Sequence, residues 1–178
     1  MTTFTTWFDL VGGVATLAGM AMVIGFLAVL FVPRMPGARA IREAIHRYHV
    51  LAGFLLSTMA MVATLVYSEV IGFVPCEFCW LQRIALYPLS VIFGVALIRK
   101  ELTEYLVPLV LSLIGMILAA IHIGIQLSED SIFCVPGTVT CSTIYVTEFG
   151  FITLPVMALT VFSLLALVSV HGLLWSRD

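Results

Sequence analysis

Charged residues are scarce in this chain of 178 residues. Asp, Glu, Lys and Arg make up 10% of it and hydrophobic residues 62%, whereas soluble domains contain about 25% charged and about 45–50% apolar residues. So little charge excludes an ordinary soluble domain, and the net charge of −2 carries no indication of a nucleic-acid partner. Internal repeats and low-complexity tracts are also absent. The composition therefore predicts an integral membrane protein.

Five hydrophobic stretches are long enough to cross a membrane as helices, which takes about 20 residues. The segments between them are short and leave no room for a soluble domain. The predicted spans cover residues 7–32, 48–68, 76–98, 105–127 and 149–175.

Lysine and arginine are missing from three of the flanking segments, namely residues 1–6, 69–75 and 128–148. Seven of the eight basic residues lie instead after the first stretch, after the third stretch and in the C-terminal tail. Short loops rich in lysine and arginine stay in the cytoplasm, so the N-terminus is predicted to lie outside and the C-terminus inside. The first stretch has no basic residues before it and arginines after it, which predicts a retained span and not a cleaved signal peptide.

Cysteine occurs four times in the chain. The four cysteines form two pairs, Cys76/Cys79 and Cys134/Cys141, and both fall on the predicted extracytoplasmic side, where disulfides persist. The alternatives to redox chemistry are two structural disulfides or a zinc site. Zinc usually takes closely spaced ligand pairs, and six residues separate Cys134 from Cys141, so we expect no metal. A Cys-x-x-Cys pair closes too small a ring to brace a fold, which favours reversible redox chemistry.

Pro75 suits the start of a helix, so both sulfurs of the first pair are expected in or beside its first turn, where the helix dipole favours a thiolate. Arg83 follows Cys79 by four residues, which places the two on one helix face. The structural alternatives for this arginine are an ion pair with Glu77 or Glu69, or extension to the outer headgroups. The functional interpretation is that Arg83 holds Cys79 as a thiolate and donates hydrogen bonds to the carbonyl oxygen of an electron acceptor.

The second pair lies in the longest outer segment, residues 128–148, with a Pro136-Gly137 turn signal between its cysteines. The turn lets Cys134 and Cys141 approach each other. We expect this loop to be exposed to a soluble thiol protein and to pass electrons to the helix-borne pair by thiol–disulfide exchange.

These residues resemble a known family. Residues 75–83 read PCEFCWLQR and continue to Tyr87-Pro88, and the outer cysteine loop is followed by EFGFITLP at 148–155. This combination resembles the DsbB/BdbC disulfide-formation proteins from about residue 47 to the C-terminus, and the short loop spacing is closer to the BdbC-like branch. The resemblance implies a four-helix transmembrane bundle in residues 48–178, with residues 1–47 forming an extra transmembrane helix and a basic cytoplasmic loop.

The resemblance also implies an activity. Such a protein is a thiol:quinone oxidoreductase of the bacterial cytoplasmic membrane that oxidises a DsbA-like, thioredoxin-fold thiol oxidase and passes the electrons to a quinone, either ubiquinone or menaquinone. Cys134 and Cys141 match the partner-facing pair, with Cys134 favoured as the attacked sulfur. Cys76 and Cys79 match the quinone-facing pair, and Arg83 matches the quinone-side arginine.

Two further polar residues are predicted near the quinone. His122 lies about five residues from the outer end of the fourth span, where it is either a quinone contact and proton donor or a hydrogen-bonded structural histidine. Gln82 is either a hydrogen-bond donor to a quinone oxygen or a contact to a neighbouring helix.

Two other functions remain open from the sequence. An enzyme like vitamin K epoxide reductase combines the same parts, but there the loop pair precedes the Cys-x-x-Cys pair, which is the reverse of the order here. A membrane scaffold or transporter subunit with structural disulfides would leave the position of Arg83 unexplained.

Overall fold

The computed structural model describes residues 2–31, 38–99, 105–128 and 141–175. Within these ranges the protein is all-helical and has no strand, as predicted. The long helices are α1 (Thr2–Phe31), α2 (Ala38–Leu65), α3 (Glu77–Arg99), α4 (Leu106–Ser128) and α5 (Leu154–Trp175), and a π-helix, η1 (Val66–Val70), continues α2.

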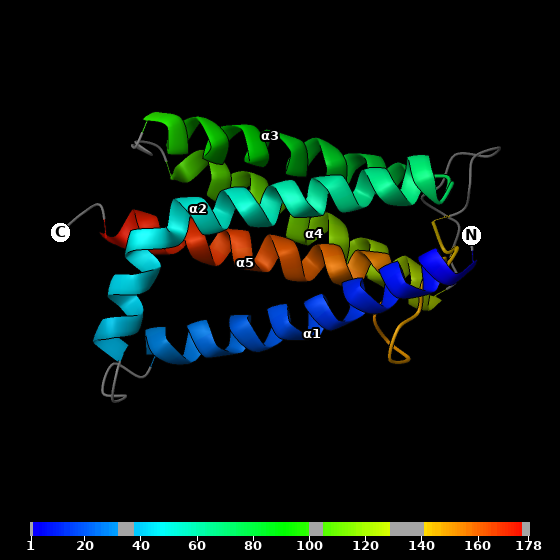
Figure 1. The fold of residues 1–178 in the computed structure, drawn as a ribbon, viewed down its shortest axis with the longest axis horizontal. Coiled ribbons are helices and arrows are strands. Elements are labelled where there is room, and N and C mark those ends of the chain that lie inside the picture. The colour runs from blue at the N-terminus through cyan, green and yellow to red at the C-terminus, as the bar shows by residue number, and fades with distance from the viewer. Residues whose placement is uncertain (1, 32–37, 100–104, 129–140, 176–178) are drawn as a thin grey trace.

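Each long helix, with η1 counted as the continuation of α2, contains a stretch of 21 to 26 residues that is apolar enough to cross a membrane, which confirms the five predicted spans. Helices are the expected form because lipid offers no hydrogen bonds, so the backbone of each span has to satisfy its own N–H and C=O groups. Figure 1 shows the long helices running along one common direction, apart from the first part of α2.

Three helices begin five or more residues from the predicted start, and the first of them, α1, begins at Thr2 and not at residue 7. Helix α2 begins at Ala38 and not at residue 48, and its first part runs across the end of the bundle before the helix turns into line (Figure 1). The segment 38–47 contains arginines among alanines and isoleucines. All three residue types are acceptable helix formers. The charge of the arginines nevertheless excludes the segment from a hydrophobic run.

Helix α5 begins at Leu154 and not at residue 149. Phe149 and Gly150 have φ angles of 51° and 80°, a left-handed conformation that an α-helix does not contain. An isolated antiparallel bridge between Glu148 and Ile152 closes this turn, so the family-like segment that precedes α5 is a tight turn and not helix.

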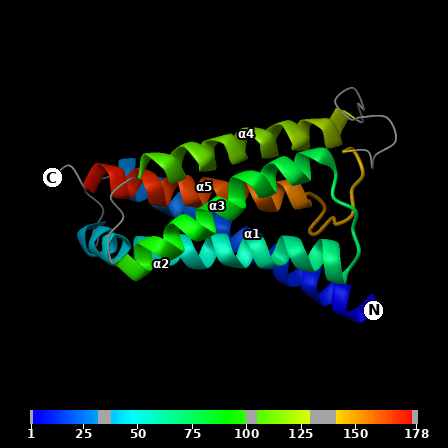
Figure 2. The same ribbon diagram turned by 90° about the horizontal axis from the view of Figure 1, so that it is seen from above.

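The helices α2, α3, α4 and α5 form the bundle, and α1 lies along α5 on its outside (Figures 1 and 2). Glycines allow α1 to approach closely. A Cβ atom added to Gly19 would stand 2.8 Å from the side chain of Thr160 on α5, and one added to Gly13 would stand 2.9 Å from Glu148. Small residues permit such close approach where helices pack within a membrane.

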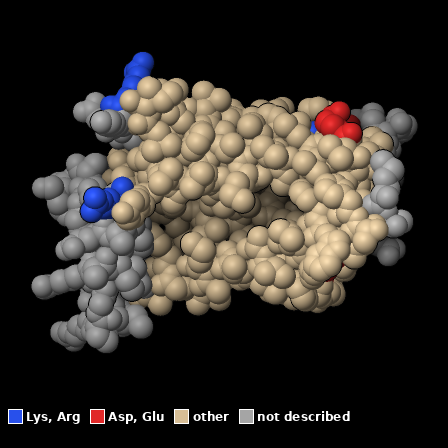
Figure 3. Space-filling model, viewed as in Figure 1, with Lys and Arg blue, Asp and Glu red and all other residues tan. Residues whose placement is uncertain are grey.

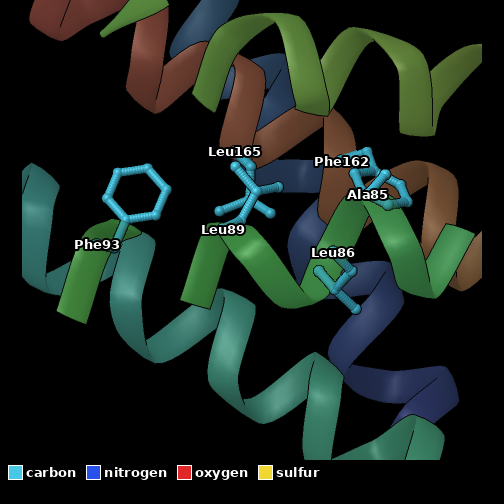
Figure 4. Packing of buried hydrophobic residues seen from close by; sticks show 6 residues of the cluster. All are labelled: Ala85, Leu86, Leu89, Phe93, Phe162 and Leu165. Carbon is cyan, nitrogen blue, oxygen red and sulfur yellow. The ribbon is translucent and has the colours of Figure 1, made fainter. Parts of the chain in front are cut away.

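The core of the bundle lies between α3 and α5 (Figure 4). Partly buried side chains of α2 and α4 pack against it from either side. This packing fixes the axial position of α3 and therefore of the cysteine pair at its start. The buried residues of the cluster are Ala85, Leu86, Leu89, Phe93, Phe162 and Leu165.

Among the described residues, the exposed charged side chains gather near the two ends of the molecule. On the face drawn in Figure 3, basic side chains appear at the end that holds the C-terminus and acidic side chains at the opposite end, with an uncharged belt between them. Such a belt is the surface that a bilayer requires.

Candidate functional site

The first cysteine pair lies at the start of α3. The carbonyl of Cys76 accepts a hydrogen bond from the N–H of Trp80 at 3.1 Å, so Cys76 immediately precedes the helix and Cys79 lies in its first turn. Their sulfur atoms are 3.1 Å apart and are present as thiols. Cys76 is buried and Cys79 is half-buried. The pair is therefore arranged to form and break one disulfide bond.

The two sulfurs have different environments. The neighbouring Cys79 sulfur and burial together raise the pKa of Cys76, which precedes the α3 span, to about 12. Cys76 is therefore a protonated thiol at neutral pH and donates its S–H toward Cys79. The expectation that both sulfurs favour the thiolate is wrong for Cys76, because contact with Cys79 and loss of water outweigh the helix dipole there.

The spacing of the two sulfurs also bears on metal binding. His122 joins Cys76 and Cys79 in a group whose donor atoms all lie within 4.8 Å of one another. Two sulfurs that bind one tetrahedral zinc at about 2.3 Å stand roughly 3.7 Å apart, whereas these stand 3.1 Å apart. The geometry fits exchange between thiol and disulfide better than metal ligation.

His122 on α4 connects the cysteine pairs. Its Nε2 lies 3.7 Å from the Cys76 sulfur and 3.1 Å from the backbone carbonyl of Cys141, and its Nδ1 lies 3.4 Å from Nε2 of Gln82. An amide nitrogen is a donor, so Nδ1 accepts from Gln82 and Nε2 carries the proton that it donates to Cys141. The side chains of Gln82 and His122, both predicted site residues, are thus in contact and tie α3 to α4.

Cys141 is 1% exposed and packs in one cluster with Cys76 and Ile125. The expectation of an exposed loop pair is therefore wrong for Cys141, because the returning part of the loop covers the start of α3. Cys134 lies outside the described residues. The sulfurs at the start of α3 and the second cysteine of the loop consequently share one buried region.

Tyr145 anchors this returning segment. Its hydroxyl donates to the carbonyl of Val74 at 3.2 Å, and its ring stacks on Phe73 with centroids 4.6 Å apart. Gln126 on α4 adds a contact to the carbonyl of Thr143 at 3.5 Å. No sequence pattern indicated this anchor, because Tyr145 has no recognisable spacing relative to the cysteines.

Arg83 is buried inside the bundle at 7% exposure. Its Nη2 donates to the backbone carbonyl of Thr64 at 2.7 Å, and its guanidinium carbon lies 5.2 Å from the centre of the Trp80 ring. In the described part of the chain no ion pair joins Arg83 to Glu69 or Glu77. Its charge is thus held by a carbonyl and an aromatic face.

The contact between Arg83 and α2 involves Thr64, which no sequence pattern indicated. The hydroxyl of Thr64 lies 3.1 Å from the hydroxyl of Tyr87, which is one turn beyond Arg83 on α3. The helix changes to the π-helix η1 two residues after Thr64, a local widening that often occurs at functional sites. Tyr87 belongs to the family-like motif, and that was the available signal.

A cavity of about 580 Å³ begins at this group of polar residues. Cys79, Gln82, Arg83 and His122 line one part of it, and mainly apolar side chains, most of them from α1, α2 and α5, line the rest. Small-molecule sites have volumes of about 300–1,000 Å³ and combine apolar walls with a few converging polar groups. Its residues fit a molecule with a polar ring and an apolar tail, such as a prenylated quinone.

Comparison with known proteins identifies the family. The family model "Disulfide bond formation protein DsbB" matches residues 46–172. This chain belongs to the DsbB family. The DsbB match begins just before the α2 span and leaves α1 outside it. No solved structure gives a significant match to the chain.

Several relatives carry the same description. The "SPbeta prophage-derived disulfide bond formation protein B" of Bacillus subtilis is 43% identical over 113 residues, which are 63% of this chain and 76% of the relative. A "Probable disulfide formation protein" of Oceanobacillus iheyensis is 45% identical over 56% of this chain and 71% of its own length. "Disulfide bond formation protein C" of Bacillus subtilis is 37% identical over 64% and 84%. These names agree with the BdbC-like branch of the DsbB family.

Proposed function

We propose that this DsbB-family protein is a thiol:quinone oxidoreductase that reoxidises an extracytoplasmic, DsbA-like thioredoxin-fold oxidase. The observation that carries the proposal is the position of Cys79 and Arg83 at one end of a cavity of about 580 Å³ with mainly apolar walls. A cysteine pair, a buried cation and an apolar chamber together suit electron transfer to a lipid-soluble acceptor.

The arrangement of the chain in the membrane belongs to the same proposal. Residues 48–178 form the catalytic bundle, and residues 1–47 add one span and a basic cytoplasmic segment. The bundle lies in the bacterial cytoplasmic membrane with the cysteines outside and the C-terminus inside, in accord with the position of the basic residues.

Electrons enter at the loop pair. A thiolate of the reduced partner attacks the Cys134 sulfur of the Cys134–Cys141 disulfide, which forms a mixed disulfide and releases Cys141 as a thiolate. Cys141 then attacks Cys76 in the Cys76–Cys79 disulfide and releases Cys79 as a thiolate. The packing of Cys141 against Cys76 supports this step.

The cycle closes by two further exchanges. The other thiol of the partner attacks the partner sulfur that is bonded to Cys134 in the mixed disulfide. This step forms the partner's disulfide and releases Cys134 as a thiolate. Cys134 attacks Cys141 in the Cys76–Cys141 bond, which restores the loop disulfide and releases Cys76. Cys76 takes up a proton because its pKa is raised to about 12, and both electrons now reside on the Cys76/Cys79 pair.

A bound quinone supplies the two-electron acceptor that returns this pair to the disulfide. Arg83 offers the remaining N–H donors of its guanidinium to an acceptor oxygen and lowers the energy of negative charge beside Cys79. His122 and Gln82 hold the start of α3 against α4, and the Nε2 nitrogen of His122, which carries a proton, is 3.7 Å from the Cys76 sulfur. His122 is thus placed to move a proton at that sulfur.

The two other functions differ in what they require. An enzyme like vitamin K epoxide reductase would place its loop pair before the Cys-x-x-Cys pair in the chain. A scaffold with structural disulfides would have no use for a buried arginine beside a chamber. The membership of the DsbB family supports the oxidoreductase over both.

The proposal is tested by anaerobic mixing of the purified protein with a reduced thioredoxin-fold oxidase and a soluble quinone analogue. We expect one equivalent of quinone to be lost for each partner disulfide formed, and no loss with Cys79→Ser. Formation of partner disulfide without loss of quinone, or no reaction of the wild type, would contradict the proposed function.

A further inference from the structure

Helix α1 contributes one side of the cavity although it lies outside the family match. Its lining residues are Phe8, Val11, Gly12, Ala15 and Thr16. They recur at intervals of three and four, so they form one continuous stripe on the helix. The stripe begins near the predicted outer end of the span and runs inward over two turns, or about 12 Å.

Helix α1 is held by α5 and stands apart from α2 along this stripe. The outer end of the gap is closed by Phe8, whose ring meets Tyr67 edge to face with centroids 5.0 Å apart. Further inward, the surface of the molecule is hollowed between α2 and α1 (Figure 3). The cavity therefore opens sideways through the part of the protein that faces lipid.

A cavity of about 580 Å³ requires an occupant. Protein interiors are close-packed, and the free energy cost of an empty cavity rises with its volume. Packing of α1 directly on α2 would remove the space, yet close contacts at Gly13 and Gly19 hold α1 on Glu148 and Thr160 instead. The occupant has to be apolar along α1 and polar where the cavity reaches Cys79 and Arg83.

We propose that α1 forms the wall of a channel for the prenyl tail of the quinone, an inference that rests on the proposed function. The ring lies at Cys79 and Arg83, and the tail runs between the α1 stripe and α2 toward the opening in the membrane. The extra helix thereby adds a wall to a groove of the bundle, and the resulting channel, which opens to lipid, favours quinones with long tails.

Photocrosslinking tests the position of the tail without reliance on turnover. The wild-type protein in lipid nanodiscs is illuminated with a quinone analogue that carries a diazirine at the far end of its prenyl tail, and labelled peptides are mapped by mass spectrometry. We expect labelling of the α1 stripe that an excess of unlabelled long-tail quinone abolishes. Labelling confined to other helices, or α1 labelling that the competitor leaves unchanged, would overturn the inference.

Variants give a second, kinetic test. Ala15 is exposed and lines the cavity, so Ala15→Phe fills the channel from the α1 side. Ala21 on the same helix is also exposed and lies outside the lining, so Ala21→Phe is the matched control. Ala15→Phe should raise the ratio of the KM for a long-tail quinone to the KM for a tail-less analogue by roughly tenfold, and Ala21→Phe should leave this ratio unchanged.

The proposed channel and the proposed function are tested separately by these measurements. If the wild type reduces both quinones and Ala15→Phe behaves like Ala21→Phe, the channel is refuted while the proposed function stands. If the wild type reduces neither quinone in the presence of the reduced partner, the proposed function itself fails.

Discussion

The buried guanidinium of Arg83 places a positive charge inside an apolar bundle, a position that usually marks a function or a specific partner. Its described contacts are one carbonyl and one aromatic ring, at 2.7 Å and 5.2 Å. These contacts use only part of the five N–H donors of the guanidinium and fix the orientation of the remaining donors. Such an arrangement suits an arginine that completes its interactions with a ligand.

Replacement of Arg83 by Gln should weaken the quinone step. Loss of one charge-assisted hydrogen bond costs about 1.5–3 kcal/mol, so the KM for quinone should rise by about 10- to 150-fold. Exchange between the partner and the loop pair should stay near normal in single-turnover assays. Arg99→Gln at the end of the same helix is the control. An unchanged dependence on quinone would assign Arg83 a structural role.

The raised pKa of Cys76 predicts the pH dependence of its alkylation in the reduced protein. A thiol whose pKa is about 12 in place of the usual 9 is almost fully protonated at pH 8, so its reaction with iodoacetamide should be slow. The rate should rise about tenfold for each pH unit up to pH 10 because only the thiolate reacts. Mass spectrometry of the Cys76 peptide gives the rate, and a plateau near pH 9 would show that the thiol is unperturbed.

At the scale of helices, hydrophobic length predicted all five spans, because a bilayer imposes the same minimum on each. The start of α2 was misplaced, since its arginines end the hydrophobic run without ending the helix. Pro75 correctly predicted that the Cys-x-x-Cys pair lies at the start of a helix, because the start of a helix depends on the local sequence. The contact of Arg83 with Thr64 and the burial of Cys141 depend on how distant segments pack, and no local pattern carries that information.

The close packing of α4 on α5 also predicts how a substitution of Gly115 on α4 changes the stability of the protein. A Cβ atom there would overlap the ring of Phe162 on α5, whereas a Cβ at Gly124 on the same helix meets nothing within 4 Å. Gly115→Ala should therefore destabilise the bundle by about 1–3 kcal/mol, and Gly124→Ala should be neutral or slightly stabilising. Thermal unfolding in detergent compares the two, and equal Tm values would refute this account of α4–α5 packing.

At the scale of the whole molecule, the separation of charge predicts the orientation in the membrane. Thr147 is exposed in the segment before α5, so Thr147→Cys should react with a membrane-impermeant thiol reagent applied from outside. A tag after Asp178 should be accessible from the cytoplasm alone. Labelling of the C-terminal tag from outside would show the opposite orientation, which would contradict the placement of the cysteines on the extracytoplasmic side.

The central claim is that the two cysteine pairs exchange electrons through Cys141 and Cys76, which share one buried cluster. The double variant Cys79→Ser/Cys134→Ser retains these two cysteines alone. Mild oxidation should join them in a disulfide, detected by mass spectrometry of unreduced peptides, under conditions in which the wild type forms its Cys76–Cys79 bond. If both cysteines of the folded double variant remain thiols after this oxidation, the pairs are not connected in this way and the proposed path is wrong.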